Sequence, residues 1–203
     1  MAPRMSEEHL QQRRADIMHA AIDVFIEQGY AHTTMKHVMD ATGLSRGGLY
    51  RYFSNKEDLF EAIIEKQLSD AAANTEQLLR ATESHWELLM QLMFGKSGNP
   101  DAEMDPLAPS KLEFFITGRN DGRRKAYAKK RYDLGVRIYR DVIKAGQDAG
   151  EFSNRYESDL LARSIITFID GLALEDSILP DDDVQLEKQS GLFVDYLKMA
   201  LDV

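Results

Sequence analysis

Apolar residues recur at helical spacing along nearly the whole chain, and no sustained alternation with a period of two is bounded by hairpin turns. This pattern predicts an all-α fold. The first strong segment covers residues 12–28, where Met18, Ile22 and Phe25 share one face, and Gly29 is expected to end that helix. In the second part of the chain, further helices are expected at about 83–94, 107–118, 121–149, 157–178 and 184–202.

Two short helices separated by a tight turn are expected after Gly29. The first begins with Thr33 or Thr34 as its N-cap, and Gly43 supplies the residue that tolerates a positive φ in the turn. Ser45 is expected to cap the second helix, which is about two turns long. A short helix, a turn and a second short helix form the arrangement of a helix-turn-helix, whose second helix enters the major groove of DNA.

The next segment carries another helix-start signal. In Ser54-Asn55-Lys56-Glu57, Ser54 is expected to be the N-cap and Glu57 to complete a capping box three residues later. The apolar residues Leu59 and Ile63 follow at helical spacing. A helix is therefore predicted from about residue 55 to beyond residue 68.

The second short helix exposes residues whose chemistry suits DNA. Arg46 can donate two hydrogen bonds to the O6 and N7 atoms of guanine, and Tyr50 and Tyr52 can donate hydroxyl protons to phosphates. Gly47 allows close approach of the backbone. Lys56 places a cation and free backbone N–H groups where a phosphate could lie.

The charge distribution agrees with a local rather than a general affinity for DNA. The formal net charge is −9, which argues against a non-specific polyanion binder. Most of this acidity lies in residues 61–203, whereas residues 41–56 contain no acidic side chain and three cations. For residues 33–56, the alternative interpretation is an ordinary helical corner whose cations form a solvated face.

Other compositional features exclude several classes of protein. Cysteine is absent, so disulfide scaffolds, thiolate metal sites and cysteine nucleophiles are excluded, and a reducing cytoplasm is the expected location. The sequence shows neither a signal-peptide pattern nor a long apolar run, so we expect neither export nor membrane insertion. The five histidines form no i, i+4 pair, and no phosphate-binding or dinucleotide-binding glycine motif occurs, so we expect no catalytic residue, metal or cofactor.

Two segments together resemble the DNA-binding part of the TetR family of transcriptional regulators: Thr33-Thr34-Met35-Lys36-His37-Val38 and Gly43-Leu44-Ser45-Arg46-Gly47-Gly48-Leu49-Tyr50-Arg51-Tyr52-Phe53-Ser54-Asn55-Lys56-Glu57-Asp58-Leu59. With the preceding amphipathic helix, the similarity covers about residues 12–64. The chain departs from the family pattern at Met39 and Thr42, where small residues are common. The resemblance and the helix chemistry assign DNA contacts to Thr33, Thr34, Lys36, Ser45, Arg46, Gly47, Tyr50, Tyr52 and Lys56.

The resemblance also implies a division into two domains. Residues 1–60 would form a three-helix helix-turn-helix domain, and residues 61–203 a larger helical domain that binds a small effector and forms a homodimer. Helices 157–178 and 184–202 from each subunit would then form a four-helix interface. The alternative is that both helices only fill the core of one subunit. The interface residues expected on this basis are Ile165, Leu172, Phe193 and Leu197.

Aromatic and methionine side chains in the larger domain suit a cavity for an apolar or amphipathic molecule, although such residues are also common in a plain core. Acidic residues near them favour a cationic effector, basic residues at the start of helix 121–149 favour an anionic one, and both sets also fit solvated faces. The expected pocket residues are Trp86, Met90, Phe94, Phe114, Tyr132 and Phe168, with Met93, Phe115, Tyr127 and Tyr139 as further candidates. The acidic set is Glu87, Glu113 and Asp170, and the basic set is Arg119, Arg123, Arg124, Lys125, Lys129, Lys130 and Arg131.

The function expected from these features is that of a homodimeric, ligand-responsive transcriptional repressor that binds a palindromic operator. Two other classes stay open at this point. One is a helical ligand-binding or scaffolding protein that uses its N-terminal domain for protein contacts. The other is an activator or an architectural DNA-binding protein.

Overall fold

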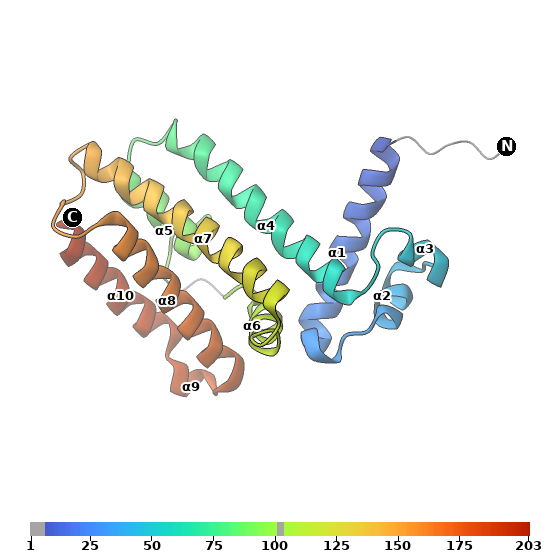
Figure 1. Ribbon diagram of the computed structural model, residues 1–203. Helices are drawn as coiled ribbons and strands as arrows, with labels where there is room; N and C mark the ends of the chain where they lie inside the picture. Colours follow the sequence, from blue (N-terminus) through green and yellow to red (C-terminus); the bar gives the residue numbers. More distant parts are fainter. Residues whose placement is uncertain (1–6, 101–103) are drawn as a thin grey trace.

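The computed structural model of the chain describes residues 7–100 and 104–203, and within these ranges the regular structure is entirely helical, as the apolar pattern predicts. Helices α1 to α3 form a small unit at one end, and the long helix α4 connects it to a bundle of the remaining helices (Figure 1). The helices are α1 (Glu7–His32), α2 (Met35–Thr42), α3 (Arg46–Tyr50), α4 (Lys56–Leu79), α5 (His85–Phe94), α6 (Ala108–Thr117), α7 (Gly122–Asp148), α8 (Ser158–Ile178), α9 (Asp181–Val184) and α10 (Leu186–Leu201).

The expected caps position α2 and α3. The hydroxyl of Thr34 accepts a hydrogen bond from the backbone N–H of His37, and the hydroxyl of Ser45 accepts one from the N–H of Gly48. Gly43 ends α2 with a φ of 65°, a conformation that glycine adopts without a Cβ clash. Gly29 interrupts α1 with a φ of 72°, and one further turn follows it.

The start of α4 differs from the expected capping box. Asn55, not Ser54, is the N-cap, because its side-chain oxygen accepts the N–H of Asp58 at 2.8 Å. The Asp58 carboxylate in turn accepts hydrogen bonds from the backbone N–H and the hydroxyl of Ser54. Asp58 therefore takes the place expected for Glu57, but it reaches back to Ser54, the residue before the N-cap, and not to the N-cap itself.

The N-terminal unit, which we call the head, consists of α1–α3 and has its apolar core against the first turns of α4. Phe25 and Phe60 meet edge to face with ring centroids 4.5 Å apart, and Leu49 and Phe53 are buried in the same cluster. Phe114 of α6 enters this core beside Phe60, at a centroid distance of 5.3 Å. An element of the second part of the chain therefore completes the core of the head.

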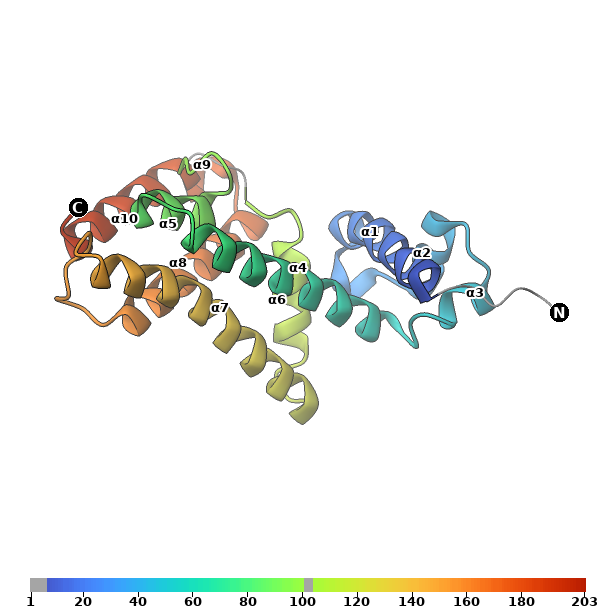
Figure 2. The ribbon, with the colours of Figure 1, turned by 90° about the horizontal axis from the view of Figure 1, so that it is seen from above.

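The remaining helices form a second core, and we call α5–α10 the body. Leu89, Ile143, Ile165 and Leu197 are buried there, from four different helices. Seen from above, α4 and α7 diverge toward the head, and α6 crosses below them (Figure 2). Because α4 is continuous across the expected domain boundary between residues 60 and 61, that boundary stays a prediction.

Candidate nucleic-acid interface and effector cavity

Helix α3 presents a compact set of side chains to solvent. Arg46, Gly47 and Tyr50 are exposed, whereas Leu49 of the same helix is fully buried and anchors it to the core. The guanidinium of Arg46 lies 5.4 Å from the ring centroid of Tyr50, so the two side chains are neighbours on this face. Because residues 41–56 contain no acidic side chain, α3 presents a positively charged, narrow helix end of the kind that fits a major groove.

Other residues expected at the DNA are placed around α3. Thr34, Lys36 and Ser45 are exposed, and Thr34 and Ser45 lie at the N-termini of α2 and α3, where partial positive charge attracts phosphate. Tyr52 is half-buried against the core of the head. Gly48 has its would-be Cβ 3.4 Å from the Ser45 hydroxyl, so its small size helps the cap to form.

The structure gives Thr33 a different position from the one expected. Its side chain is 1% exposed, and its hydroxyl donates to the carbonyl oxygen of Gly29 at 2.6 Å. The hydroxyl thus satisfies a carbonyl at the end of α1 after the break at Gly29 and does not face solvent.

Lys56 also differs from the expectation of a free cation. Its ammonium donates to the carbonyl oxygens of Tyr30, Ala31 and Thr33 at 2.6, 2.9 and 2.8 Å and lies 4.6 Å from the Tyr30 ring centroid. Burial lowers the pKa of Lys56, and the negative charge of Glu113 partly offsets this. An ammonium has three protons, and all three are engaged in holding the end of α1 against α4.

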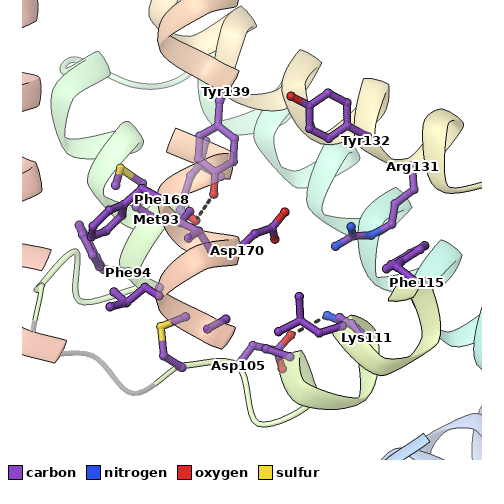
Figure 3. Close-up of a pocket in the computed structure, with 18 of the residues that line it drawn as sticks. Met93, Phe94, Asp105, Lys111, Phe115, Arg131, Tyr132, Tyr139, Phe168 and Asp170 are labelled. Carbon is purple, nitrogen blue, oxygen red and sulfur yellow. Dashed lines mark hydrogen bonds and ion pairs between the residues drawn. The ribbon is translucent and has the colours of Figure 1, made fainter. Parts of the chain in front are cut away.

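A cavity of about 650 Å³ lies in the body between α5, α6, α7 and α8 (Figure 3). It is lined by expected residues, namely Phe94, Tyr132 and Phe168, together with Met93, Phe115 and Tyr139. Charged groups that line it come from both sets proposed on sequence: Asp170 and Arg131. Two further lining residues, Asp105 and Lys111, form an ion pair at 2.6 Å that sequence spacing did not indicate.

Three of the expected pocket residues lie elsewhere. Phe114 is fully buried in the core of the head, because its ring packs edge to face on Tyr30 at 5.0 Å. Trp86 and Met90 line a separate depression with Glu87 at the outer side of α5. Tyr127 contacts the head core, and its hydroxyl donates to the carbonyl oxygen of Glu61 at 3.1 Å. None of these residues lines the cavity between α5, α6, α7 and α8.

The first turn of α7 is bonded to α4 and α6. Arg123 forms ion pairs with Glu57 and Glu61, and the hydrogen bonds that it donates to both carboxylates raise its pKa. Arg124 donates to the carbonyl oxygen of Phe114 and lies 4.1 Å from that ring centroid. Two members of the basic cluster therefore join helices and do not form an anion site.

Helices α8 and α10 bury the face that was expected at a subunit interface. Ile165, Leu172 and Leu197 are 0%, 4% and 3% exposed in a single subunit, and Phe193 stacks on Phe168 at 3.9 Å. Within a single subunit these four residues pack in or against the core, and the interface that was expected at them stays a prediction. Other apolar side chains of the two helices are exposed: Leu160, Leu174 and Ile178 on α8, and Leu192, Tyr196 and Met199 on α10.

Among residues 7–100 and 104–203, no group of three or more His, Asp or Glu side chains could hold a metal ion. No helix in that part of the chain is long and apolar enough to span a bilayer.

The geometry defines a two-part helical protein with a helix-turn-helix head and a cavity-bearing body. Residues 17–63 match the family described as "Bacterial regulatory proteins, tetR family", and residues 99–187 match "Tetracyclin repressor-like, C-terminal domain". The HTH-type transcriptional regulator YfiR of Bacillus subtilis is 33% identical over 172 residues, which cover 85% of this chain and 83% of that protein. The chain belongs to the TetR family of transcriptional regulators.

A second relative and two solved structures agree with this assignment. The HTH-type transcriptional repressor Rv1474c of Mycobacterium tuberculosis is 30% identical over 84% of this chain and 85% of its own length. Salmonella enterica GusR has a TM-score of 0.73 at 20% identity and covers 99% of this chain and 100% of its own. A TetR regulator of Haloarcula marismortui has a TM-score of 0.74 at 22% identity, over 94% of this chain and 99% of its own. At these identities the two structures support the fold alone.

Proposed function

We propose that the protein is a transcriptional repressor that binds a palindromic operator as a homodimer and is released by a small amphipathic effector. The observation that carries this proposal is α3, which is capped by Ser45, anchored by Leu49 and exposes Arg46, Gly47 and Tyr50. Thr34, Lys36 and Ser45 would contact phosphates, and Arg46 would read bases. The half-buried Tyr52 would present its hydroxyl to the sugar-phosphate backbone of the DNA.

The exposed apolar faces of α8 and α10 support a dimer. Leu160, Tyr196 and Met199 line one shallow depression on this face, and their side chains are 56%, 55% and 66% exposed. Contiguous apolar surface of this kind marks protein interfaces. Two helices from each subunit would form a four-helix bundle related by a two-fold axis, and the two heads would then address two half-sites.

Helix α6 connects the cavity to the head. Lys111, Leu112 and Phe115 line the cavity. On the other side of α6, the buried hydroxyl of Ser110 donates to the carbonyl oxygen of Phe25 at 2.6 Å, and the Glu113 carboxylate accepts the N–H of Ala31 at 2.8 Å. A ligand that shifts α6 would move the head through these bonds and change the spacing of the recognition helices, with a coupling of about 1–3 kcal/mol.

The first experiment is selection of binding sites for the purified chain from a random DNA duplex pool at two salt concentrations. Recovery of a palindrome, with binding that weakens steeply as salt rises, is the expected result. A folded dimer that selects no sequence would contradict the proposal and favour the scaffolding interpretation. Placing a recovered site upstream or within a reporter promoter then separates repression from activation.

A further inference from the structure

The cavity between α5 and α8 contains four charged side chains, and three of them have partners. Asp105 and Lys111 form an ion pair with each other. The guanidinium of Arg131 lies 4.8 Å from the ring centroid of Phe115 and stacks on it. Asp170 has no hydrogen bond or ion pair with any residue in the described part of the chain.

Asp170 is an exposed residue that lines the cavity, and protein atoms enclose its carboxylate in part. Burial by the surrounding protein raises its pKa, and the positive charges of Arg131 and Lys111 offset only part of this effect. The hydroxyl of the neighbouring Tyr139 donates to the backbone carbonyl of Leu92 at 3.2 Å, so its proton is not directed to Asp170. The carboxylate keeps contact with solvent through the cavity, where a ligand can reach it.

The cavity wall is apolar on one side of Asp170 and carries a positive charge on the other. Figure 3 shows Met93, Phe94 and Phe168 on one side and Arg131 with Phe115 on the other, with Asp170 between them. A positively charged group beside Asp170 gains an ion pair and the negative faces of aromatic rings. An anion at the same place meets the unpaired carboxylate of Asp170. Of the two cations that line the cavity, Lys111 is paired with Asp105, and Arg131 lies on the other side, stacked on Phe115.

We propose that the effector is an amphipathic organic cation, whose ammonium pairs with Asp170 and whose apolar body packs against Met93, Phe94 and Phe168. This inference rests on the proposed function for the consequence of binding, although not for the binding itself. It also resolves the choice of charge that the sequence leaves open. Of the acidic set, Asp170 lines the cavity, whereas Glu113 is bonded to Ala31 of the head.

The test uses three probes that share one aromatic body and differ in charge: 1-naphthylmethylammonium, 1-naphthylmethanol and 1-naphthaleneacetate. Their affinities for the full chain are measured by isothermal titration calorimetry at pH 7. The ammonium probe is expected to bind about tenfold more tightly than the alcohol, and the acetate most weakly. Tightest binding of the acetate, or equal binding of all three, would overturn the proposal.

Substitutions assign the effect to one carboxylate. Asp170→Asn is expected to reduce affinity for the ammonium probe about tenfold and to leave the alcohol nearly unchanged. The matched control is Asp176→Asn, which removes the same charge from an exposed position of α8 that does not line the cavity. Arg131→Gln removes the opposing charge and is expected to strengthen ammonium binding. Equal losses in Asp170→Asn and Asp176→Asn would contradict the assignment.

Operator binding is measured separately on the same samples. If the chain binds a selected operator but shows no preference for the ammonium probe, the inference about the ligand fails and the proposed function stands. If the ammonium probe binds through Asp170 but no operator is selected, the proposed function fails and the cation site stands.

Discussion

At the scale of single residues, the head separates side chains that can read DNA from those that hold the head together. Arg46 and Lys36 are exposed on adjacent helices, whereas Thr33 and Lys56 are turned inward and bonded to carbonyls at the end of α1. All four residues are polar and lie within the same motif. Their roles differ because the interruption of helix α1 at Gly29 leaves backbone carbonyl groups that need hydrogen-bond donors.

Arg46→Ala is expected to relax sequence preference at one base pair of each half-site, at a cost of about 1–3 kcal/mol for the preferred site. Lys36→Ala would remove the proposed phosphate contact, so it should weaken binding to all sequences alike and reduce the slope of log affinity against log salt by about one. Fluorescence anisotropy with the selected operator and a scrambled duplex measures both effects. Identical behaviour of the two variants would contradict this division of roles.

Lys56→Met is expected to lower the free energy of unfolding by about 2 kcal/mol, because it leaves three carbonyl oxygens without their charged donor. Urea unfolding followed by circular dichroism measures this. Lys36→Met is the matched control, since Lys36 is exposed and should change stability little. If Lys56→Met unfolds like the wild type, the three hydrogen bonds do not support the head.

The sequence predicts residue roles well where they depend on local geometry. Thr34, Gly43 and Ser45 take their expected cap positions, because a cap is decided by the four or five residues around it. It predicts them poorly where the partner is distant. Lys56 bonds a segment about 25 residues earlier, and Phe114 joins a core built mainly from residues 17–64, so neither role has a local signal.

At the scale of elements, α5 depends on a cap supplied from outside the helix. The Glu151 carboxylate, beyond the end of α7, accepts hydrogen bonds from the backbone N–H groups of His85 and Trp86 and from the hydroxyl of Ser84. Burial opposes its ionisation, but these hydrogen bonds and one with the His85 ring outweigh burial and lower its pKa to about 2. The residue thereby fixes the start of a helix that lines the cavity.

The depressed pKa gives a defined pH dependence of stability. A carboxyl whose pKa is lower in the folded than in the unfolded chain stabilises the fold above the unfolded value, near 4.5, and this contribution disappears as the pH falls toward 2. Glu151→Gln should therefore cost on the order of 2 kcal/mol above pH 5, and the difference from wild type should shrink below it. Glu157→Gln is the control, because that exposed N-cap makes no side-chain cap bond. A difference independent of pH would contradict this account.

The sequence predicts where a helix begins and ends more accurately than it predicts which side of the helix is buried. The long helices lie within a few residues of their expected ranges, because apolar spacing and glycine punctuation determine them. In α8, apolar residues occupy most of the circumference, so spacing alone does not show which stripe packs inward. Ile165 and Leu172 took the inward positions, and Leu160 and Ile178 kept the exposed ones.

At the scale of the whole molecule, the head, α6 and the cavity form one continuous path, while helices α8 and α10 lie in the body, away from the head (Figure 1). An interface there would hold two bodies together and leave both heads free to move. The ligand-dependent step then requires no change in the interface itself, because the bonds from α6 reach the head directly.

Introducing charge into this face tests the arrangement. Leu160→Lys combined with Met199→Lys is expected to convert a dimer into monomers of 23.1 kDa, because four lysines would meet in a contact that now offers apolar side chains. Sedimentation velocity measures the mass. Affinity for the palindrome should fall steeply while affinity for an isolated half-site is retained, since each head stays folded but the second head no longer binds as part of the same molecule.

Ile116→Lys is the matched control, because Ile116 is an apolar residue of α6 that is 50% exposed and belongs to neither α8 nor α10. It should leave the mass and the half-site affinity unchanged. If the double variant of α8 and α10 remains dimeric with full affinity for the palindrome, the interface lies on another face. The two α3 helices would then be related by a different two-fold axis. A movement of α6 would have to change the spacing of the α3 helices about that axis.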